Sequence, residues 1–219
     1  MQDNWQQQLE ANEIVLIDGA MGTELQRRGV EMNKTAWSGA AVLTDPDKVR
    51  ETHEDYIRAG ASVIITNTFG STRQMLEPAG FGDKVEKVHR DAVELARQAR
   101  ANAADHPVAI AGSISTEPPA FDRDSFLSPD KELEAYREAA GLLAEAGVDL
   151  LALEMIVDAT HASRAMQAAL ETGLPVWLGA GCRKRDDGRI VSFDVGEIEF
   201  ETMLDTLIPM GPTVVNIMH

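Results

Sequence analysis

The stretch Asp18-Gly19-Ala20-Met21-Gly22-Thr23-Glu24 decides how this chain is interpreted, because it directly follows the apolar run Ile14-Val15-Leu16-Ile17. Four apolar residues bounded by turn formers predict a fully buried strand. The glycines after it let the backbone turn tightly. Ligands of α/β folds bind at the carboxyl ends of strands. We therefore expect the first strand to deliver Asp18 to a ligand site, although a plain Asp-Gly turn is the simpler alternative.

The same unit of strand and helix repeats along the chain. Further apolar runs predict strands over residues 62–66, 108–112, 150–153, 176–180 and 214–217. Between them, helices are expected to begin at Asp45-Pro46, near Asp83 with Glu86 completing a capping box, at Ser128-Pro129, near Asp158 and near Glu197. Strands that alternate with helices and lack polar alternation predict a parallel sheet with helices on both faces or around it.

Two architectures fit this alternation, an open doubly wound sheet and a closed barrel. A dinucleotide-binding sheet would carry G-x-G-x-x-G after its first strand, whereas Gly19 and Gly22 are spaced differently. We therefore favour an α/β fold of the (β/α)8 TIM-barrel type. Because about six strands are countable and such a barrel usually needs about 250 residues, we expect it to be incomplete at the C-terminus. Without a linker or a shift in composition, residues 1–219 are predicted to form a single, truncated barrel domain.

Composition excludes several classes of partner. The chain has 36 acidic and 20 basic residues and a formal net charge of -16, which disfavours nucleic acids and anionic membrane surfaces. It has no apolar run long enough to span a bilayer and no secretory signal pattern. We therefore expect a cytoplasmic protein without nucleic-acid or membrane partners. A single cysteine, Cys182, rules out an internal disulfide and a metal site built from several cysteines of this chain.

The residues that directly follow the predicted strands carry the candidate chemistry. Asp18 follows the first strand, Asn67 and Thr68 follow the second, and Glu154 follows the fourth. In a barrel these residues share one mouth. Two carboxylates can hold an ammonium group, and free backbone N–H groups can hold a carboxylate. The set therefore suits a small zwitterion, although a structural salt bridge is the plainer alternative for Glu154.

These residues resemble the homocysteine S-methyltransferase family, which includes the homocysteine-binding module of cobalamin-dependent methionine synthase and the betaine-dependent enzymes. The resemblance is carried, in order along most of the chain, by residues 16–24, 59–61, 66–69, 112–114, 118–119, 154 and 186–189. It implies a (β/α)8 barrel that transfers a methyl group to the thiol of homocysteine or a related small thiol, giving methionine.

The resemblance also implies roles for particular residues. Asp18 and Glu154 would hold the amino group of the substrate. The backbone N–H groups of Gly19 and Ala20 would receive its carboxylate, and Asn67 and Thr68 would line the pocket.

The chain departs from the resemblance in its metal chemistry. The family pattern implies three cysteines that bind zinc, which converts the substrate thiol into the thiolate nucleophile. The first of them would follow Asn216, where this chain has Ile217, which cannot bind a metal. The other two would follow an eighth strand, which the chain does not reach. His219 lies two residues beyond the expected ligand and Cys182 lies on another strand, so we assign no metal ligand and no catalytic residue.

Two functions stay open on this basis: a methyltransferase acting on a small thiol amino acid, and a divergent or vestigial amino-acid-binding barrel without zinc-dependent transfer. Ile217 favours divergence from the family, and the missing strands favour truncation. The methyl donor stays open among folate through cobalamin, betaine and S-methylmethionine. A phosphate-binding barrel is a weaker third reading, because its phosphate loops follow strands seven and eight. An open barrel exposes strand edges, so we also expect a homo-oligomer that covers them.

Overall fold

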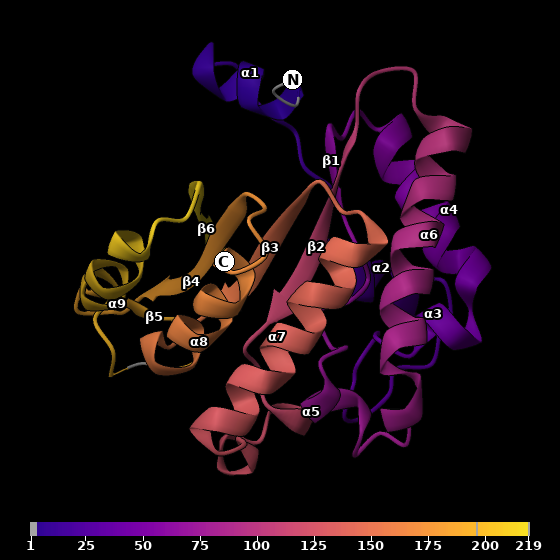
Figure 1. The fold of residues 1–219 in the computed structure, drawn as a ribbon. Coiled ribbons are helices and arrows are strands. Elements are labelled where there is room, and N and C mark those ends of the chain that lie inside the picture. Colours follow the sequence, from indigo (N-terminus) through magenta and orange to yellow (C-terminus); the bar gives the residue numbers. More distant parts are fainter. Residues whose placement is uncertain (1–3, 196, 219) are drawn as a thin grey trace.

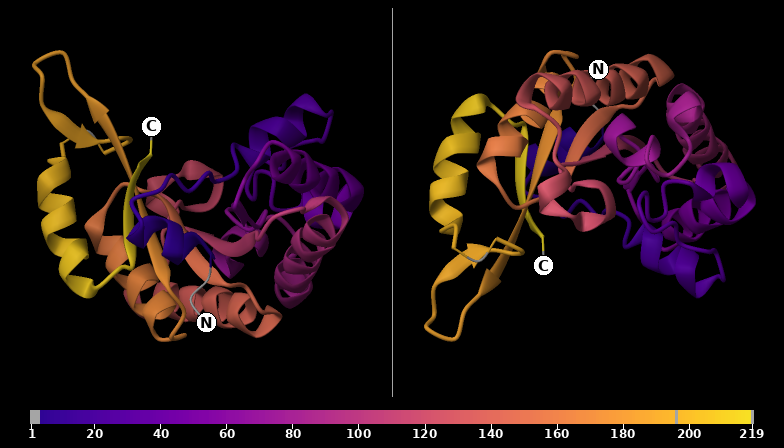
Figure 2. Two further views of the ribbon diagram at one scale, coloured as in Figure 1. Left: turned by 90° about the horizontal axis from the view of Figure 1, so that it is seen from above. Right: turned by 90° about the horizontal axis from the view of Figure 1, so that it is seen from below.

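A curled parallel sheet organises the protein in the computed structural model, which describes residues 4–195 and 197–218 (Figures 1 and 2). Its strands pair in the order of the sequence: β1 (Val63–Ile65), β2 (Ala109–Ser115), β3 (Leu150–Ile156), β4 (Val176–Lys184) and β6 (Val214–Met218). A doubly wound sheet would reverse its strand order at a switch point. The unreversed order and the curl therefore identify an incomplete barrel-type sheet, in agreement with the architecture favoured from the sequence.

Five longer helices surround the outer face of the sheet (Figure 2): α4 (Pro46–Arg58), α6 (Val85–Ala103), α7 (Pro129–Ala146), α8 (Ala159–Leu170) and α9 (Phe200–Leu207). Shorter helices are α1 (Asn4–Glu10), α2 (Met21–Arg27), α3 (Ala41–Thr44) and α5 (Arg73–Leu76), with 3-10 turns at Gly82–Lys84, Pro119–Phe121, Arg123–Ser125 and Ile208–Met210. Strand residues such as Ile110 and Leu151 pack on helix residues such as Tyr136 and Met166 to form the main core. Within the described ranges, no helix has both the length and the apolar composition needed to cross a bilayer.

The inner face of the sheet is filled from one end by α1. Trp5 is fully buried in a second apolar cluster with inward-facing strand residues, among them Val63, Ala109 and Leu150. Its ring meets the ring of Trp177 edge to face, with centroids 5.1 Å apart and planes at 83°. Figure 1 shows α1 at the end of the sheet where the strands begin. The helix therefore closes the amino end of the barrel interior and leaves the carboxyl end open.

Both edges of the curled sheet expose apolar side chains. In the first predicted strand, only Ile17 forms an isolated parallel bridge, with Val63, and Ile14 is 88% exposed. The expectation of a fully buried strand is wrong here, because this segment is the sheet edge and no strand of the described residues covers it. At the opposite edge, Ile217 on β6 is 69% exposed. The hairpin that joins β4 to the antiparallel β5 (Ile190–Ser192) was not expected from the sequence.

Local sequence signals account for some helix ends and not for others. Asp158 caps α8 as expected, because its side chain accepts hydrogen bonds from the N–H groups of Thr160 and His161. Gly147 ends α7 in the left-handed conformation, with φ of 87°. The expected capping box at Asp83 is not formed, because a 3-10 turn precedes α6 and Lys84 becomes its N-cap residue.

Trp5→Ala should lower the free energy of unfolding by about 3–5 kcal/mol, because it removes a fully buried aromatic ring. The matched control is Leu9→Ala in the same helix, since Leu9 is 41% exposed and should cost about 0.5 kcal/mol or less. Urea titrations followed by tryptophan fluorescence and circular dichroism measure both. Equal losses for the two variants would contradict the packing of α1 inside the sheet.

Candidate functional site

Asp18 lies where the first segment stops pairing with β1. Its backbone N–H donates to the Val63 carbonyl at 3.0 Å, and its side-chain Oδ2 accepts the N–H of Ile65 at 2.7 Å. The carboxyl group thus takes the place of the main-chain carbonyl that a longer parallel strand would supply. Its second oxygen, Oδ1, is buried without a hydrogen-bond partner. One oxygen therefore fixes the side chain, and the other stays unpaired.

Glu154 projects inward from β3. Inward and outward residues alternate along a strand; accordingly Ala152 belongs to the inner cluster and Leu153 to the outer core. The hydroxyl group of Ser113, on the neighbouring strand β2, donates to Oε2 of Glu154. Ser113 was not singled out from the sequence as a site residue. The alternation Gly112-Ser113-Ile114-Ser115 contained the signal, because it places both serines on one face of the strand.

A cavity of about 260 Å³ at the carboxyl ends of the strands brings these residues together. Ile17 contributes to its wall from one sheet edge, and Asn216 and Met218 contribute from the other; the remaining lining residues are Ile65, Ala152, Leu153, Glu154, Trp177 and Ile217. Asp18 directly follows Ile17, and its carboxyl group lies close enough to Glu154 to be repelled by its charge. Glu154 therefore lines the cavity, whereas Asp18 does not line it itself and lies beside it, next to Ile17.

The two carboxyl groups lack a compensating cation. The pKa of Asp18 is raised well above its usual value, mainly by burial. The hydrogen bond from the Ile65 N–H lowers this pKa, and the charge of Glu154 raises it further. Burial also raises the pKa of Glu154, and the Ser113 hydroxyl group opposes that shift. Over the described part of the chain, no lysine, arginine or histidine acts on either pKa. The pair therefore forms an acidic, partly desolvated site without its own counterion.

Gly19 and Ala20 form an exposed turn between Asp18 and α2. Tyr56 of α4 lies against this turn: a Cβ atom on Gly19 would stand only 3.0 Å from the Tyr56 hydroxyl oxygen. That hydroxyl group also donates to the Ala20 carbonyl at 3.5 Å. Burial and the nearby Asp18 charge raise the pKa of Tyr56. A side chain at position 19 would therefore crowd the Tyr56 ring, which borders this turn.

Asn67 and Thr68 are buried and bonded within the protein. The Asn67 side-chain amide donates to the Ser38 carbonyl at 2.8 Å and accepts from the Ser38 hydroxyl at 2.9 Å. The Thr68 hydroxyl group donates to the Ser113 carbonyl at 2.7 Å. Neither residue lines the cavity that Glu154 borders. Thr68 instead reaches the site through Ser113, whose hydroxyl group binds Glu154.

Met155 holds a strained backbone directly after Glu154. Its φ is 55°, a left-handed value that few residues other than glycine adopt. The register between β3 and β4 shifts between Leu153 and Ile156, as in a β-bulge. The Met155 N–H donates to the sulfur of Met218 at 3.4 Å. Strain of this kind costs about 1–3 kcal/mol and is concentrated at functional sites, and here it sets the direction of the strand next to Glu154.

The residues of the described chain do not fit the zinc site that the resemblance implies. Within residues 4–195 and 197–218, no group of three or more His, Cys, Asp or Glu side chains is placed to hold a metal ion. Cys182 packs against the outer core rather than the inner cavity. Ile217 is apolar, and His219 lies outside the described residues. We therefore assign no step of the chemistry to a metal bound by these residues.

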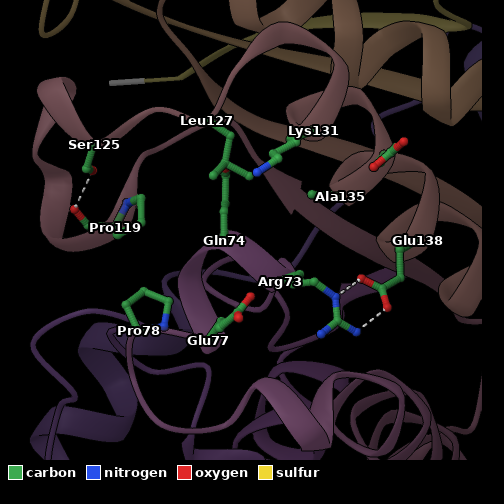
Figure 3. Close-up of a pocket in the computed structure, with 11 residues that line it drawn as sticks. Arg73, Gln74, Glu77, Pro78, Pro119, Ser125, Leu127, Lys131, Ala135 and Glu138 are labelled. Carbon is green, nitrogen blue, oxygen red and sulfur yellow. Dashed lines mark hydrogen bonds and ion pairs between the residues drawn. The ribbon is translucent and has the colours of Figure 1, made fainter.

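A second and larger cavity, of about 820 Å³, is lined by neither of these acids. Figure 3 shows the side chains that line it. It is bordered by α5, the loop from Pro119 to Leu127, and the first turns of α7. Arg73 forms a two-point ion pair with Glu138 at one side of it (2.7 and 2.5 Å). None of the site residues expected from the sequence lines it. Its size alone therefore does not make it the functional site.

Asp18→Asn should remove a pH dependence of stability. The folded state raises the pKa of Asp18, so the wild-type carboxyl group destabilises the fold increasingly as the pH rises from about 4, the usual Asp value, through its raised folded value. The difference in unfolding free energy, variant minus wild type, should therefore grow over that window. Urea titrations between about pH 4 and pH 8 measure it. The exposed Asp83→Asn should show no such growth; a pH-independent difference for Asp18→Asn would contradict the burial.

Comparison with known proteins agrees with this geometry. A family model described as homocysteine S-methyltransferase matches residues 15–215. Homocysteine S-methyltransferase 2 of Zea mays is 30% identical over 223 residues, covering 92% of this chain and 65% of the maize protein. Homocysteine S-methyltransferase of Escherichia coli K12 is 34% identical over 165 residues, covering 68% of this chain and 52% of that protein. The chain thus spans about two thirds or less of the length of these relatives.

A solved structure shows the same likeness in three dimensions. The metallated form of the homocysteine methyltransferase MmuM from Escherichia coli superposes with a TM-score of 0.79 at 25% sequence identity. The match covers 97% of this chain and 76% of that chain. Together with the family model and the maize relative, it shows that this chain belongs to the homocysteine S-methyltransferase family.

Proposed function

We propose that this protein is a homocysteine S-methyltransferase that binds homocysteine, or a related small thiol amino acid, between Asp18 and Glu154 and converts it to the S-methyl product, methionine. The observation that carries the proposal is that the charge of Glu154, which lines the cavity, acts on Asp18, which directly follows Ile17 of the cavity wall, although the two acids are far apart in the sequence. Family membership supplies the reaction. We place the reaction in the cytoplasm, where thiols stay reduced.

The arrangement of polar groups supports binding of an amino acid. The ammonium group would lie between the unpaired Oδ1 of Asp18 and the carboxyl group of Glu154. The exposed turn of Gly19 and Ala20, which precedes α2, would present its backbone N–H groups to the substrate carboxylate. Asn67 and Thr68 would support the site indirectly, through their hydrogen bonds to Ser38 and Ser113. This set orients the substrate and leaves its sulfur free for an in-line transfer.

In the chemical step, the methyl carbon exchanges its bond to the donor atom for a bond to the substrate sulfur. The substrate sulfur, as thiolate, forms a bond to the methyl carbon of the donor, and the bond between that carbon and the donor atom breaks. The thiol proton passes to water before the attack, because the thiolate is the nucleophile. The chain's own part in this step is binding and orientation of the amino acid.

Asp18→Asn and Glu154→Gln should each weaken homocysteine binding by about 1.5–3 kcal/mol, which is roughly 10- to 150-fold, because each removes a charged hydrogen-bond partner of the ammonium group. Isothermal calorimetry with reduced L-homocysteine measures the change. Glu134→Gln, a carboxylate of the larger cavity, is the matched control and should leave the affinity unchanged. Undiminished binding by both site variants would overturn the proposed site.

A second candidate is an amino-acid-binding barrel without transfer chemistry, and Ile217, which stands where the resemblance implies a cysteine, favours it. Metal analysis and assay of the same sample separate the two candidates. Methionine formation from homocysteine with S-methylmethionine, betaine or methylcobalamin supports the enzyme. Homocysteine binding without methionine formation from any of these donors supports the binding protein.

The continuous sheet and its shared core support a single domain over residues 1–219, and we propose that it belongs to the full (β/α)8 barrel of the family. The free edges would then be covered by further strands or, in this chain alone, by a second copy. Ile14, Leu16 and Ile17 are exposed at one edge, and Val215 and Ile217 at the other. Exposed apolar edges of this kind pair with other chains.

Light scattering at micromolar concentration should therefore give a mass above that of the monomer. Ile217→Lys should shift the protein toward the monomer, because a charged residue discourages pairing at a strand edge. The matched control is Ile208→Lys, since Ile208 is 48% exposed but lies after α9, away from either edge. A monomeric wild-type protein would count against self-association.

A further inference from the structure

The two acids of the site create an electrostatic problem when the cavity holds no ligand. Asp18 and Glu154 are both partly buried and lie within range of each other's charge. Their hydrogen-bond donors are one backbone N–H, from Ile65, and one hydroxyl group, from Ser113. Two carboxylates that share a desolvated site cannot both ionise without a large cost. One of them is therefore expected to keep a proton at a pH where a solvated carboxyl group would have lost it.

The elements packed around the pair do not relieve this cost. From α4, the group that faces Asp18 is the Tyr56 phenol, which is neutral at physiological pH. Glu24 and Arg28, near the turn that follows Asp18, act on Tyr56, and Arg28 is already bonded to Glu24 and to Asp55. From β2 the Ser113 hydroxyl group faces Glu154. From β6 the cavity receives Asn216, Ile217 and Met218, none of which is charged.

We propose that the Asp18–Glu154 pair of the empty site holds one shared proton, and that an entering primary ammonium group displaces this proton to the solvent. The inference rests on the proposed function for its choice of an amino acid as ligand. The exchange balances in charge: the site gains the positive charge of the ammonium group and loses that of the proton. The ammonium group also supplies several N–H donors at once, and can therefore reach the unpaired Oδ1 of Asp18 together with the Glu154 carboxyl group.

The proposal sets the direction of the pH dependence of binding. Where the empty pair is protonated, the ligand competes with a proton, so its apparent affinity rises as the pH increases. Above the pKa at which the empty pair loses its proton, the apparent affinity no longer depends on the protonation of the pair. This follows from linkage, because the slope of the logarithm of the binding constant with pH equals the number of protons released. A ligand without an ammonium group displaces no proton and should gain nothing from the pair.

The experiment uses L-methionine as the probe and the full chain as the protein. Methionine has the ammonium and carboxylate groups of the proposed substrate but no thiol, so a released proton cannot come from sulfur. Calorimetry in two buffers of different ionisation enthalpy gives the number of protons released per bound ligand. We expect up to about one proton to be released per bound ligand at acid pH, and less as the pH rises. The desamino analogue 4-(methylthio)butanoate should bind at least about 10-fold more weakly and release none.

Variants assign the proton to the pair. Asp18→Asn and Glu154→Gln should each reduce the number of protons released by about half or more. Glu117→Gln is the matched control: Glu117 is 5% exposed and its pKa is also raised by burial, but it does not line the cavity. Its replacement should leave proton release unchanged. Proton release can be compared as long as at least one of the two site variants still binds methionine.

The outcomes separate this inference from the proposed function. Methionine binding with proton release that depends on Asp18 and Glu154 supports both. Methionine binding without proton release overturns the shared proton and leaves the proposed site intact. Proton release that persists in both site variants, or that disappears in Glu117→Gln, also overturns it. No binding of methionine or homocysteine overturns the proposed site and this inference together.

Discussion

A curled parallel sheet has to bury an inner face that its crossover helices cannot reach, and the protein depends on how it fills that face. Trp5 enters from α1 and meets Trp177 at the amino ends of the strands. The neighbouring inward residues Ala109, Ala111 and Ala152 are small enough to admit two indole rings. Because this filling stops partway along the strands, the carboxyl ends keep a cavity. The position of the site is thus a consequence of where the packing ends.

The curl also determines the electrostatic character of that cavity. It brings the first segment of the sheet and β6 to opposite sides of one space, with Glu154 of β3 between them. Asp18 is held there by a backbone N–H and Glu154 by a hydroxyl group, both neutral donors. A cation supplied by the fold would have occupied the place of the ligand. The described residues supply no such cation to the two acids, which agrees with the ammonium ligand that we propose.

The sequence was sufficient to predict most of the parallel strands and the helices that cover them, because apolar runs and strand ends follow local patterns. The binding roles of Asp18 and Glu154 stay a prediction. The cap at Asp158 and the terminating Gly147 are local in the same sense. The exposure of Ile14 could not be predicted, since an apolar run does not reveal whether another strand covers it. Tyr56 could not be placed at the site, because its contact with Gly19 joins elements that only the folded chain brings together.

The roles of Asn67 and Thr68 illustrate a further limit of sequence patterns. Residues that follow a strand are expected at the mouth of a barrel, but side-chain direction after the last paired residue is set by hydrogen bonds that a pattern does not encode. Here Ser38 and Ser113 bind these two side chains and turn them into the protein. Asp18 is bound by a neighbour too, yet only through one of its oxygens.

The left-handed backbone of Met155 has a consequence for the evolution of heat resistance. Glycine and asparagine adopt this conformation at little cost, so either would relieve strain at position 155. Glycine would also give the segment that follows Glu154 more conformational freedom, whereas asparagine would favour the observed conformation. Selection for thermostability alone would therefore not keep a methionine at position 155.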